Sequence, residues 1–240
     1  MPADPSSVAV VIPTYNEREN LEEFVNAVRR HGYRVLVVDD NSPDGTGELA
    51  DLLASKDDLV GVVHRTSKQG LGPAYAHGFR EATADGAAIL CEIDADFSHD
   101  PAALPALIAA IDRGADLAIG SRYVDGGSTP GWPLHRRMLS KGANAYVKLM
   151  LRLSVNDSTA GFRAFRSEAL GRLHPETCLA SGYAFQVEMT WRAVREGLRI
   201  EEVPITFRDR RAGTSKMGLP IVVEAMWLVT KWGLTRSRPR

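Results

Sequence analysis

The 240-residue chain lacks the features that mark several common classes of protein. Its two cysteines, Cys91 and Cys178, are too few for a disulfide framework, and Cys91 ends an apolar run that is typical of a buried position. The N-terminal MPADPSS contains neither a basic nor an apolar segment, so we expect no secretory signal and a reducing, cytoplasmic compartment. No window reaches the roughly 20 consecutive apolar residues of a membrane-spanning helix.

An excess of charge of one sign is also absent from the chain as a whole. The 29 basic and 30 acidic side chains leave a formal net charge of −1, which argues against a protein that coats nucleic acid. The two halves differ, however, because residues 1–121 carry 9 basic and 20 acidic side chains, whereas residues 122–240 carry 20 and 10. This asymmetry indicates an anionic partner, a membrane surface, or solvated faces that merely differ.

The first half of the chain alternates short apolar runs with amphipathic helical stretches. Strands are expected at residues 8–12, 35–38, 59–63, 87–93 and 117–119, and helices at about 45–54, 75–84 and 101–113. A further helix is expected from the apolar stripe of Leu21, Phe24, Val25 and Val28. Asn16, with Glu19 three residues later, resembles the capping box of that helix, and Gly32 resembles its end. The alternation predicts βαβ units and an α/β fold with a mainly parallel sheet flanked by helices.

The second half of the chain does not continue this regular alternation of strands and helices. A glycine-rich turn at 125–131 precedes a basic helix, which contains Arg136, Arg137, Lys141 and Lys148. Further along the chain we expect a strand near 162–165, a helix near 184–196, a strand near 200–205 and an apolar helix at 219–234. No stretch is rich enough in Pro, Gly or Ser to act as a linker, so the chain is expected to form a single domain.

Three loops of the predicted sheet are expected to face one site, because ligands bind beyond the carboxyl ends of parallel strands. These loops follow Ile12, Val38 and Ile93. The first, PTYNE at 13–17, is not a dinucleotide fingerprint, and the later GLGPAY has Tyr75 where a third glycine would belong. A nicotinamide-binding domain is therefore not supported.

The other two loops carry pairs of carboxylates. Asp39 and Asp40 exceed what capping of the next helix requires, so one of them is a candidate to accept hydrogen bonds from a base edge or a ribose. Asp94 and Asp96 alternate at the end of a strand, and their hard oxygens suit Mg²⁺ or Mn²⁺ bridging to phosphate. Two surface aspartates in a turn remain the alternative. His99 is either a further ligand or a solvated residue at a helix start.

Taken together and in order, these motifs resemble a known family. VVIPTYNE at 10–17, VVDDNSPDGT at 37–46 and EIDADFSHDP at 92–101 look like a family 2 glycosyltransferase. GSRY at 120–123 and DSTAGFRAFR at 157–166 most closely resemble the polyprenol-phosphate (dolichol-phosphate) mannose synthases. The resemblance runs from about residue 8 to 218 and implies a GT-A fold, which is a Rossmann-like sheet with a divalent metal, Mg²⁺ or Mn²⁺, at an Asp-x-Asp motif.

The resemblance also divides the single domain. It implies a nucleotide-binding half at 1–121, an acceptor half at 122–218 and a C-terminal apolar and basic helix at 219–240. The nucleotide-sugar contacts that it implies are Pro13, Tyr15, Glu17, Val38, Asp40, Asp94, Ala95, Asp96, Arg122, Arg210 and Lys216. Among these, the implied catalytic residues are Asp96, Arg122, Arg210 and Lys216, since a metal and positioned cations stabilise the leaving diphosphate.

Metal and acceptor contacts follow from the same resemblance. The implied metal ligands are Asp94 and Asp96, with Ser98 at a position where some relatives carry a glutamine ligand. The implied contacts of the acceptor phosphate are Arg122, Arg136 and Ser140, and the last two lie four residues apart on one helix face.

The implied reaction is transfer of mannose from GDP-mannose to a polyprenyl monophosphate, with inversion, to give polyprenyl-phosphate β-mannose and GDP. A phosphate monoester has a second pKa of about 6, so we expect no dedicated catalytic base. The nearest alternative is a polyprenol-phosphate glucosyltransferase that uses a UDP-sugar. A sugar-nucleotide pyrophosphorylase lacks support because its glycine-rich N-terminal loop is missing, and a non-catalytic nucleotide-sugar or lipid-phosphate binding subunit is the alternative outside enzymes.

The apolar stretch at 219–234 bears on the membrane. It is 16 residues long, is interrupted by Glu224 and Lys231, and carries Trp227 and Trp232. These features suit a helix at the membrane interface, and the alternative is a terminal helix packed on the core. We therefore expect a protein peripheral to the cytoplasmic face of a membrane, held there by its own surface or by a membrane-anchoring partner.

Overall fold

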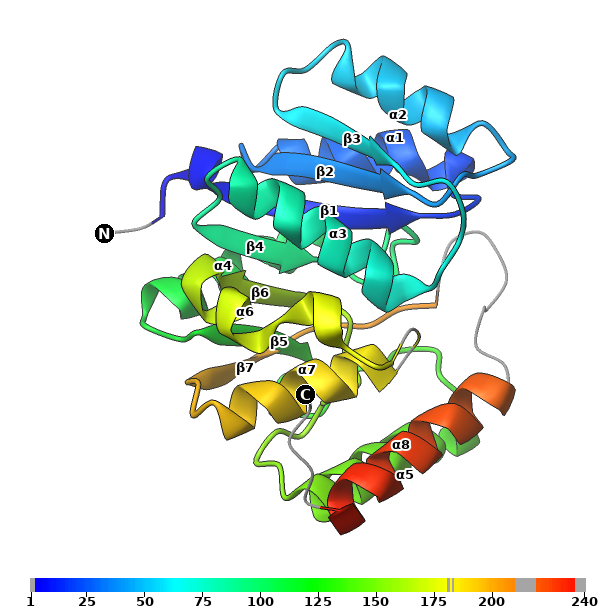
Figure 1. Cartoon of the computed structure of the whole chain (residues 1–240), viewed down its shortest axis with the longest axis vertical. Helices are drawn as coiled ribbons and strands as arrows, with labels where there is room; N and C mark the ends of the chain where they lie inside the picture. The colour runs from blue at the N-terminus through cyan, green and yellow to red at the C-terminus, as the bar shows by residue number, and fades with distance from the viewer. Residues whose placement is uncertain (1–2, 181, 183, 210–218, 236–240) are drawn as a thin grey trace.

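A seven-stranded sheet forms the centre of the computed structural model, which describes residues 3–180, 182, 184–209 and 219–235 (Figure 1). Its strands are β1 (Val8–Thr14), β2 (Arg34–Asp39), β3 (Val60–His64), β4 (Ile89–Glu92), β5 (Leu117–Ser121), β6 (Arg163–Arg166) and β7 (Ile200–Pro204). They lie in the order β3-β2-β1-β4-β6-β5-β7. Strands β1 to β4 are mutually parallel, and β6 is inserted antiparallel between β4 and β5. One sheet thus runs through both halves of the chain.

Helices cover both faces of this sheet. They are α1 (Arg18–Arg29), α2 (Thr46–Ala54), α3 (Leu71–Ala84), α4 (Leu104–Asp112), α5 (Leu134–Leu151), α6 (Ser167–Leu173), α7 (Ala184–Arg195) and α8 (Leu219–Thr235). Short 3₁₀ helices occur at Pro5–Ser7, Pro101–Ala103 and Pro175–Thr177. The α/β architecture and the predicted strands and helices are confirmed. The sequence did not predict α6, because seven residues give too few turns for a periodic pattern.

Alternating side chains of the strands build two cores. In β1, Val10 and Ile12 face the apolar cluster beneath α1, α2 and α4. Ala9 and Val11 of the same strand face the cluster that α3, α6 and α7 cover. This period of two explains why β1 carries apolar side chains on both of its faces, since both faces of the sheet are buried.

The start of α1 differs from the predicted capping box. The helix begins at Arg18 with Glu17 as its N-cap residue; the Glu17 side chain forms no capping hydrogen bond, and the N–H of Arg18 donates instead to Asp44 Oδ2 at 3.3 Å. Asn16 adopts a left-handed conformation with φ of 58°, and its N–H donates to the hydroxyl of Ser42 at 3.1 Å. The loop is therefore shaped by its neighbour after β2. Gly32 does provide the turn after the helix, with φ of +80°.

The glycines of α3 serve packing. A Cβ on Gly78 would lie 2.4 Å from Cγ1 of Val11, and a Cβ on Gly72 would lie 2.9 Å from the carbonyl oxygen of Ala180. Glycine at these positions lets α3 approach β1 and the segment before α7 closely. The GLGPAY stretch is thus a packing feature, in agreement with its weak resemblance to a nucleotide fingerprint.

Helices α5 and α8 pack against each other beside the last strands of the sheet (Figure 1). One face of α8 is buried, and Trp232 on it stacks on Trp191 of α7 with ring centroids 5.2 Å apart. The opposite face exposes Trp227 and Leu234. The helix therefore packs on the core and also presents apolar side chains to solvent. Among the described residues, no helix combines the length and the apolar character needed to cross a bilayer.

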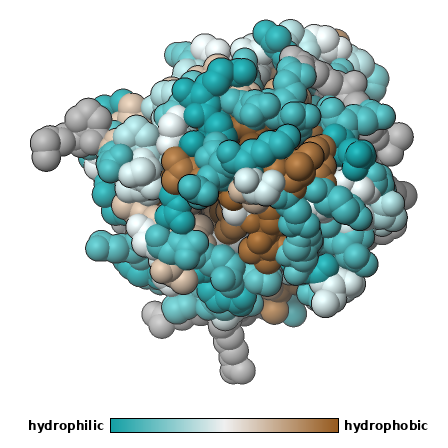
Figure 2. Space-filling view, turned by 90° about the horizontal axis from the view of Figure 1, so that it is seen from above, coloured by the Kyte–Doolittle hydropathy of each residue, from teal (hydrophilic) through white to brown (hydrophobic). Residues whose placement is uncertain are grey.

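Viewed from the β3 end of the sheet, the surface is mostly hydrophilic, with apolar side chains visible near its centre (Figure 2). Seven of the ten large apolar side chains that the described residues expose lie on α5 and α8. They are Leu134, Met138, Leu139 and Leu149 of α5 and Met226, Trp227 and Leu234 of α8. Exposed apolar surface is thus concentrated on this helix pair.

Candidate active site

The loops after β1, β2 and β4 meet at the carboxyl edge of the parallel strands. Thr14 at the end of β1 pairs in register with Asp39 at the end of β2, and its hydroxyl donates to the Asp39 carboxylate at 3.0 Å. The N–H of Glu17 donates to the Thr46 hydroxyl at 3.1 Å, which ties the first loop to the start of α2. The parallel pairing of β1 with β4 brings the third loop to the same edge.

The two aspartates after β2 have different roles. Asp39 accepts hydrogen bonds from the backbone N–H and the hydroxyl of Ser42, at 3.0 and 2.6 Å, and so builds the turn. Neither Asp39 nor Asp40 caps α2, because Asp44 accepts the N–H of Thr46 there. Asp40 makes a different contact and pairs with Arg65.

Asp40 is held by one arginine. Arg65 Nη1 donates to Asp40 Oδ1 at 2.6 Å, and the two side chains are only 7% and 8% exposed. Burial raises the pKa of Asp40, and the Arg65 guanidinium opposes part of that rise. Arg65 thus fixes the orientation of a buried carboxylate. A carboxylate in a fixed orientation can recognise the N–H groups on a base edge or the hydroxyls of a ribose.

The aspartates after β4 are each oriented by a hydroxyl donor. Tyr75 of α3 donates its hydroxyl to Asp94 Oδ1 at 3.0 Å, and burial, reinforced by the Asp94 charge, raises the pKa of Tyr75 well above its ordinary value. The backbone N–H and the hydroxyl of Ser98 donate to Asp96 Oδ1 at 2.9 and 2.6 Å. Phe97 between them has φ of 57°, which turns the chain sharply at this point.

This donor set fits a hard divalent cation. The two carboxylates are the oxygen ligands that Mg²⁺ and Mn²⁺ prefer. In the part of the chain that the structure describes, no three His, Cys, Asp or Glu side chains form a metal cluster. The hydroxyl of Ser98, the third residue expected at the metal, donates to Asp96 Oδ1 at 2.6 Å.

The structure contradicts one of the two alternatives for His99, a solvated residue at a helix start. Its side chain is 4% exposed and lies between the rings of Phe162 and Phe207, with centroids 5.4 and 4.9 Å away. Burial lowers the pKa of His99 to about 4, although the charge of Asp96 opposes this shift. The imidazole is therefore uncharged at neutral pH and buried beside the aspartate loop.

Arg122 is engaged with a buried carboxylate. Its backbone N–H, Nε and Nη2 donate to Asp157 at 2.9, 2.7 and 2.6 Å, and Nη2 also donates to the hydroxyl of Thr159 at 2.8 Å. The side chains of Arg122 and Asp157 are 8% and 0% exposed. Asp157 thus places the guanidinium at the end of β5 in a fixed plane.

A second buried ion pair lies next to the segment that contains Asp157. Glu92 of β4 and Arg163 of β6 face each other in register, with Nε and Oε1 3.4 Å apart and both side chains fully buried. Burial raises the pKa of Glu92 to about 7, and Arg163 opposes the rise. Arg163 also donates to the carbonyl oxygens of Ser158 and Ala160, at 2.9 and 2.8 Å, and so fixes the segment that follows Asp157.

The two predicted acceptor-phosphate residues of α5 are both in contact with neighbouring groups. The Arg136 guanidinium lies 4.0 Å from the ring centroid of Trp132, and its Nη1 donates to Asp209 at 2.6 Å. The hydroxyl of Ser140 accepts a hydrogen bond from the Tyr123 hydroxyl at 2.6 Å. Two adjacent residues of the GSRY motif therefore make different contacts: Arg122 binds Asp157, and Tyr123 binds Ser140 of α5.

The remaining predicted nucleotide contacts are distributed unevenly. Pro13, Tyr15 and Glu17 lie half-buried at the first loop, where the Lys68 ammonium sits 4.1 Å above the ring of Tyr15. The side chains of Val38 and Ala95 are buried in the core, so these residues can reach a nucleotide only through their backbone. The predicted diphosphate contacts Arg210 and Lys216 lie outside the described residues.

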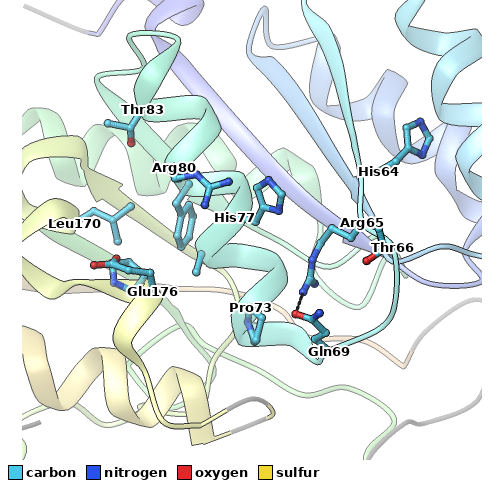
Figure 3. A pocket seen from close by; sticks show the side chains of 13 residues that line it. His64, Arg65, Thr66, Gln69, Pro73, His77, Arg80, Thr83, Leu170 and Glu176 are labelled. Atoms are coloured by element: carbon cyan, nitrogen blue, oxygen red, sulfur yellow. Dashed lines mark hydrogen bonds between the residues drawn. The ribbon is translucent and has the colours of Figure 1, made fainter. Parts of the chain in front are cut away.

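A cavity of about 640 Å³ lies on the outer side of α3, where His77 and Arg80 project into it (Figure 3). Arg65 lines it and donates to Gln69 at 3.0 Å, as well as to Asp40. Arg80 is paired with the adjacent Glu81 at 2.9 Å. None of the predicted metal or phosphate residues is among the residues that line this cavity, so it is distinct from the candidate site.

Sequence reasoning missed the residues that orient this site. Tyr75 belongs to the apolar face of α3, so its pattern indicates a core position. Asp157 lies within a motif that the resemblance identified, but the sequence assigned it no role. Asp209 and Trp132 gave no signal, because their contacts to Arg136 join segments that are distant in sequence or in an irregular loop.

The sheet order, the Asp-x-Asp loop and the buried arginine together define a glycosyltransferase of the GT-A fold. In agreement, a mannosyltransferase from Pyrobaculum calidifontis, solved in complex with GDP-Man and Mn²⁺, superposes with a TM-score of 0.61 at 20% identity, over 99% of this chain and 66% of that one. The chain belongs to glycosyl transferase family 2, whose family model matches residues 9–173.

Two relatives are similar over nearly their whole length. The polyprenol monophosphomannose synthase of Mycolicibacterium smegmatis is 51% identical over 228 residues, which cover 94% of this chain and 86% of that protein. The undecaprenyl-phosphate mannosyltransferase of Micrococcus luteus is 49% identical over 229 residues, which cover 95% and 94%. The resemblance drawn from the motifs is therefore confirmed.

Proposed function

We infer that this chain is an enzyme that transfers mannose to a polyprenyl, dolichyl-type monophosphate. The observation that carries this inference is the identity of about half of all residues, over at least 94% of the chain, to two proteins named for that reaction. The site is compatible with it, since carboxylates suited to a metal lie at the sheet edge and arginines lie in the second half of the chain.

For the donor we propose GDP-mannose, bound across the nucleotide-binding half at 1–121. The Asp40 carboxylate, fixed by Arg65, would accept hydrogen bonds from the guanine edge or the ribose, and the loop containing Tyr15 would border the base. A UDP-sugar is the alternative donor. Comparing the affinities of GDP and UDP distinguishes the two, since tighter binding of UDP would exclude a guanine-specific site.

For the metal we propose that Asp94 and Asp96 hold Mg²⁺ or Mn²⁺, with Asp96 as the direct ligand. When bound, such an ion neutralises charge that develops on the leaving diphosphate. The protein's own contribution is orientation, because Tyr75 and Ser98 each fix one carboxylate through a hydrogen bond. Arg122, Arg210 and Lys216 would add fixed positive charge around the diphosphate.

The acceptor supplies its own nucleophile. A phosphate monoester is already an anion near neutral pH, and the neutral, buried His99 is not required as a base. We propose that Arg136 and Ser140 align one phosphate oxygen with the anomeric carbon. That oxygen forms the new bond to carbon while the bond to the diphosphate breaks and its electron pair leaves with GDP, which inverts the configuration.

One assay tests this function. Purified protein is incubated with labelled GDP-mannose and a short polyprenyl monophosphate, with Mg²⁺ or Mn²⁺ and, separately, with a chelator. We expect a lipid-linked mannose that forms only when the metal is present. Failure to form this product with a metal present would contradict the proposed function, and equal yields with the chelator would contradict the proposed metal.

The role of Tyr75 predicts a change in the metal requirement. Replacing Tyr75 by phenylalanine removes the donor to Asp94, and such outer partners of metal ligands typically change metal affinity by about 10- to 100-fold. We expect the Mn²⁺ concentration that gives half-maximal activity to rise within this range. Tyr33→Phe, which removes the hydroxyl of another buried tyrosine away from the site, is the control. An unchanged Mn²⁺ requirement in Tyr75→Phe would show that the hydrogen bond is dispensable.

We further propose that α5 and α8 rest on a membrane surface. Their exposed apolar side chains adjoin basic residues of the same helices, namely Arg137, Lys141, Lys148 and Lys231. This combination suits the interface of a bilayer that contains anionic lipids. It would place the acceptor residues of α5 close to a lipid-linked phosphate.

Exposed side chains of the two helices test this surface without disturbing their buried faces. The double substitution Leu139→Asp and Trp227→Asp is expected to weaken flotation with anionic liposomes by at least about tenfold, since two apolar side chains can no longer enter the bilayer. Leu52→Asp changes an exposed leucine of α2 and is the control. Equal flotation of all three proteins would exclude this surface.

A further inference from the structure

The guanidinium of Arg136 is already bound to an anion within the chain. Its Nη1 donates to Asp209 Oδ1 at 2.6 Å, and its plane lies 4.0 Å from the indole centroid of Trp132. The side chains of Arg136 and Asp209 remain 43% and 56% exposed, so a ligand from solution can reach both. This contact joins α5 to the segment that follows β7.

That segment, residues 205–209, is anchored along its length. The N–H of Phe207 donates to the carbonyl oxygen of Ser128 at 2.9 Å, and the N–H of Arg208 donates to the carbonyl oxygen of Ser98 at 3.0 Å. The ring of Phe207 packs edge-on against Trp132, with centroids 5.3 Å apart. The backbone that carries Asp209 is thus positioned by the loop before α5 and by the aspartate loop after β4.

A carboxylate and a phosphate are equivalent ligands for a guanidinium, since both offer anionic oxygens to the same N–H donors. One Arg136 N–H cannot donate fully to both anions. A negative carboxylate beside the guanidinium also repels an incoming phosphate, whose charge is close to −2 at neutral pH.

We propose that Asp209 holds Nη1 of Arg136 in the absence of acceptor, and that the acceptor phosphate competes with it for this donor. This inference rests on the proposed function, which assigns Arg136 to the acceptor phosphate. Asp209 is thereby a positioning residue: it keeps the Arg136 guanidinium stacked on Trp132 and neutralised, and it weakens the binding of any anion that competes for the same N–H.

The contact lowers the affinity of every anion for Arg136 by the same factor, so it has most effect on the occupancy of anions that bind weakly. An exposed ion pair such as Arg136–Asp209 weakens the binding of a competing anion by no more than about fivefold. A lipid-linked phosphate gains further binding energy from contacts of its chain and can therefore still bind. Inorganic phosphate has no such additional contacts. Removing the Asp209 charge is therefore expected to make the enzyme more sensitive to inhibition by inorganic phosphate.

The experiment measures binding separately from turnover. Isothermal titration calorimetry with geranyl monophosphate is performed on the wild-type protein, Asp209→Asn, Arg136→Gln and the double variant. Inhibition of mannosyl transfer by inorganic phosphate is measured on the first two proteins. Glu201→Gln, which removes the charge that pairs with the exposed Arg113, is the control for a general change in surface charge.

We expect Asp209→Asn to bind geranyl monophosphate about two- to fivefold more tightly than wild type, with a matching fall in the phosphate concentration that halves activity. In the Arg136→Gln background, the same substitution should have no effect. Unchanged or weaker binding by Asp209→Asn, or equal tightening in Glu201→Gln, would overturn the proposal.

These outcomes separate the inference from the proposed function. Suppose that none of the proteins forms lipid-linked mannose, but that Asp209→Asn tightens the binding of geranyl monophosphate only when Arg136 is present. The competition between Asp209 and phosphate is then supported and the proposed reaction is contradicted. If mannose is transferred and Arg136→Gln weakens binding while Asp209→Asn does not tighten it, the reaction stands and the role of Asp209 fails. If Arg136→Gln does not weaken binding, the phosphate does not use Arg136, and the inference is also overturned.

Discussion

Asp96→Ala is expected to lower kcat/KM for mannosyl transfer by about a thousandfold in the presence of Mg²⁺ or Mn²⁺. The substitution removes a carboxylate that Ser98 orients through two hydrogen bonds, and with it the proposed direct ligand of the metal. Loss of one group that stabilises charge in a transition state costs about 10²- to 10³-fold, and loss of the ion would add to this. The measurement is the rate of lipid-linked mannose formation against metal concentration.

The same loop provides a matched control. Asp100 accepts the N–H of Ala102 at 2.9 Å and begins the short helix Pro101–Ala103, away from the metal carboxylates. Asp100→Ala should therefore retain activity within a few-fold of wild type. Near-wild-type rates of Asp96→Ala with either metal would contradict the proposed metal site. A comparable loss in Asp100→Ala would show that the loop is merely sensitive to substitution.

Asp157→Ala is expected to cause the largest loss of stability among the substitutions considered. The carboxylate is fully buried and accepts three hydrogen bonds from Arg122, so its removal leaves a buried guanidinium without its counter-charge. Breaking a buried pair in this way costs about 3–5 kcal/mol. For a domain of this size, this loss corresponds to a fall in Tm of about 6–20 °C, which thermal denaturation measures.

A conservative variant separates orientation from folding. Asp157→Asn keeps the shape of the side chain and loses its charge, so we expect a smaller fall in Tm together with a clear fall in kcat/KM as Arg122 loses its fixed plane. Glu196→Ala breaks the exposed pair with Arg172, where the atoms are 3.5 Å apart, and should change Tm by only a few degrees. A Tm of Asp157→Ala within 2 °C of wild type would refute the buried-pair argument.

Local patterns predicted most of the fold because the central strands are buried on both faces. Apolar runs at residues 8–12 and 117–119 identify the strands β1 and β5 without knowledge of their neighbours. The start of α1 was predicted wrongly for the opposite reason. The backbone N–H of Asn16 donates to Ser42, which is 26 residues away in the sequence. This tertiary contact sets the conformation of Asn16, and the local capping pattern does not.

The carboxylates of the site could be predicted because each follows a strand of a parallel sheet. Their order at the sheet edge follows from that topology, and Asp40, Asp94 and Asp96 are found where the motifs place them. The state of each group could not be predicted. His99 is neutral because two aromatic rings from distant segments bury it, and no local pattern shows those rings.

The class of fold, the three loops that face the site and the family can be predicted from local periodicity and motifs. The partners of the charged side chains depend on long-range packing, which brings Tyr75 to Asp94, Asp157 to Arg122 and Asp209 to Arg136. These contacts span 19, 35 and 73 residues. The charge asymmetry between the two halves therefore does not reveal the site, because the pairing of each arginine with a carboxylate is set by the tertiary structure.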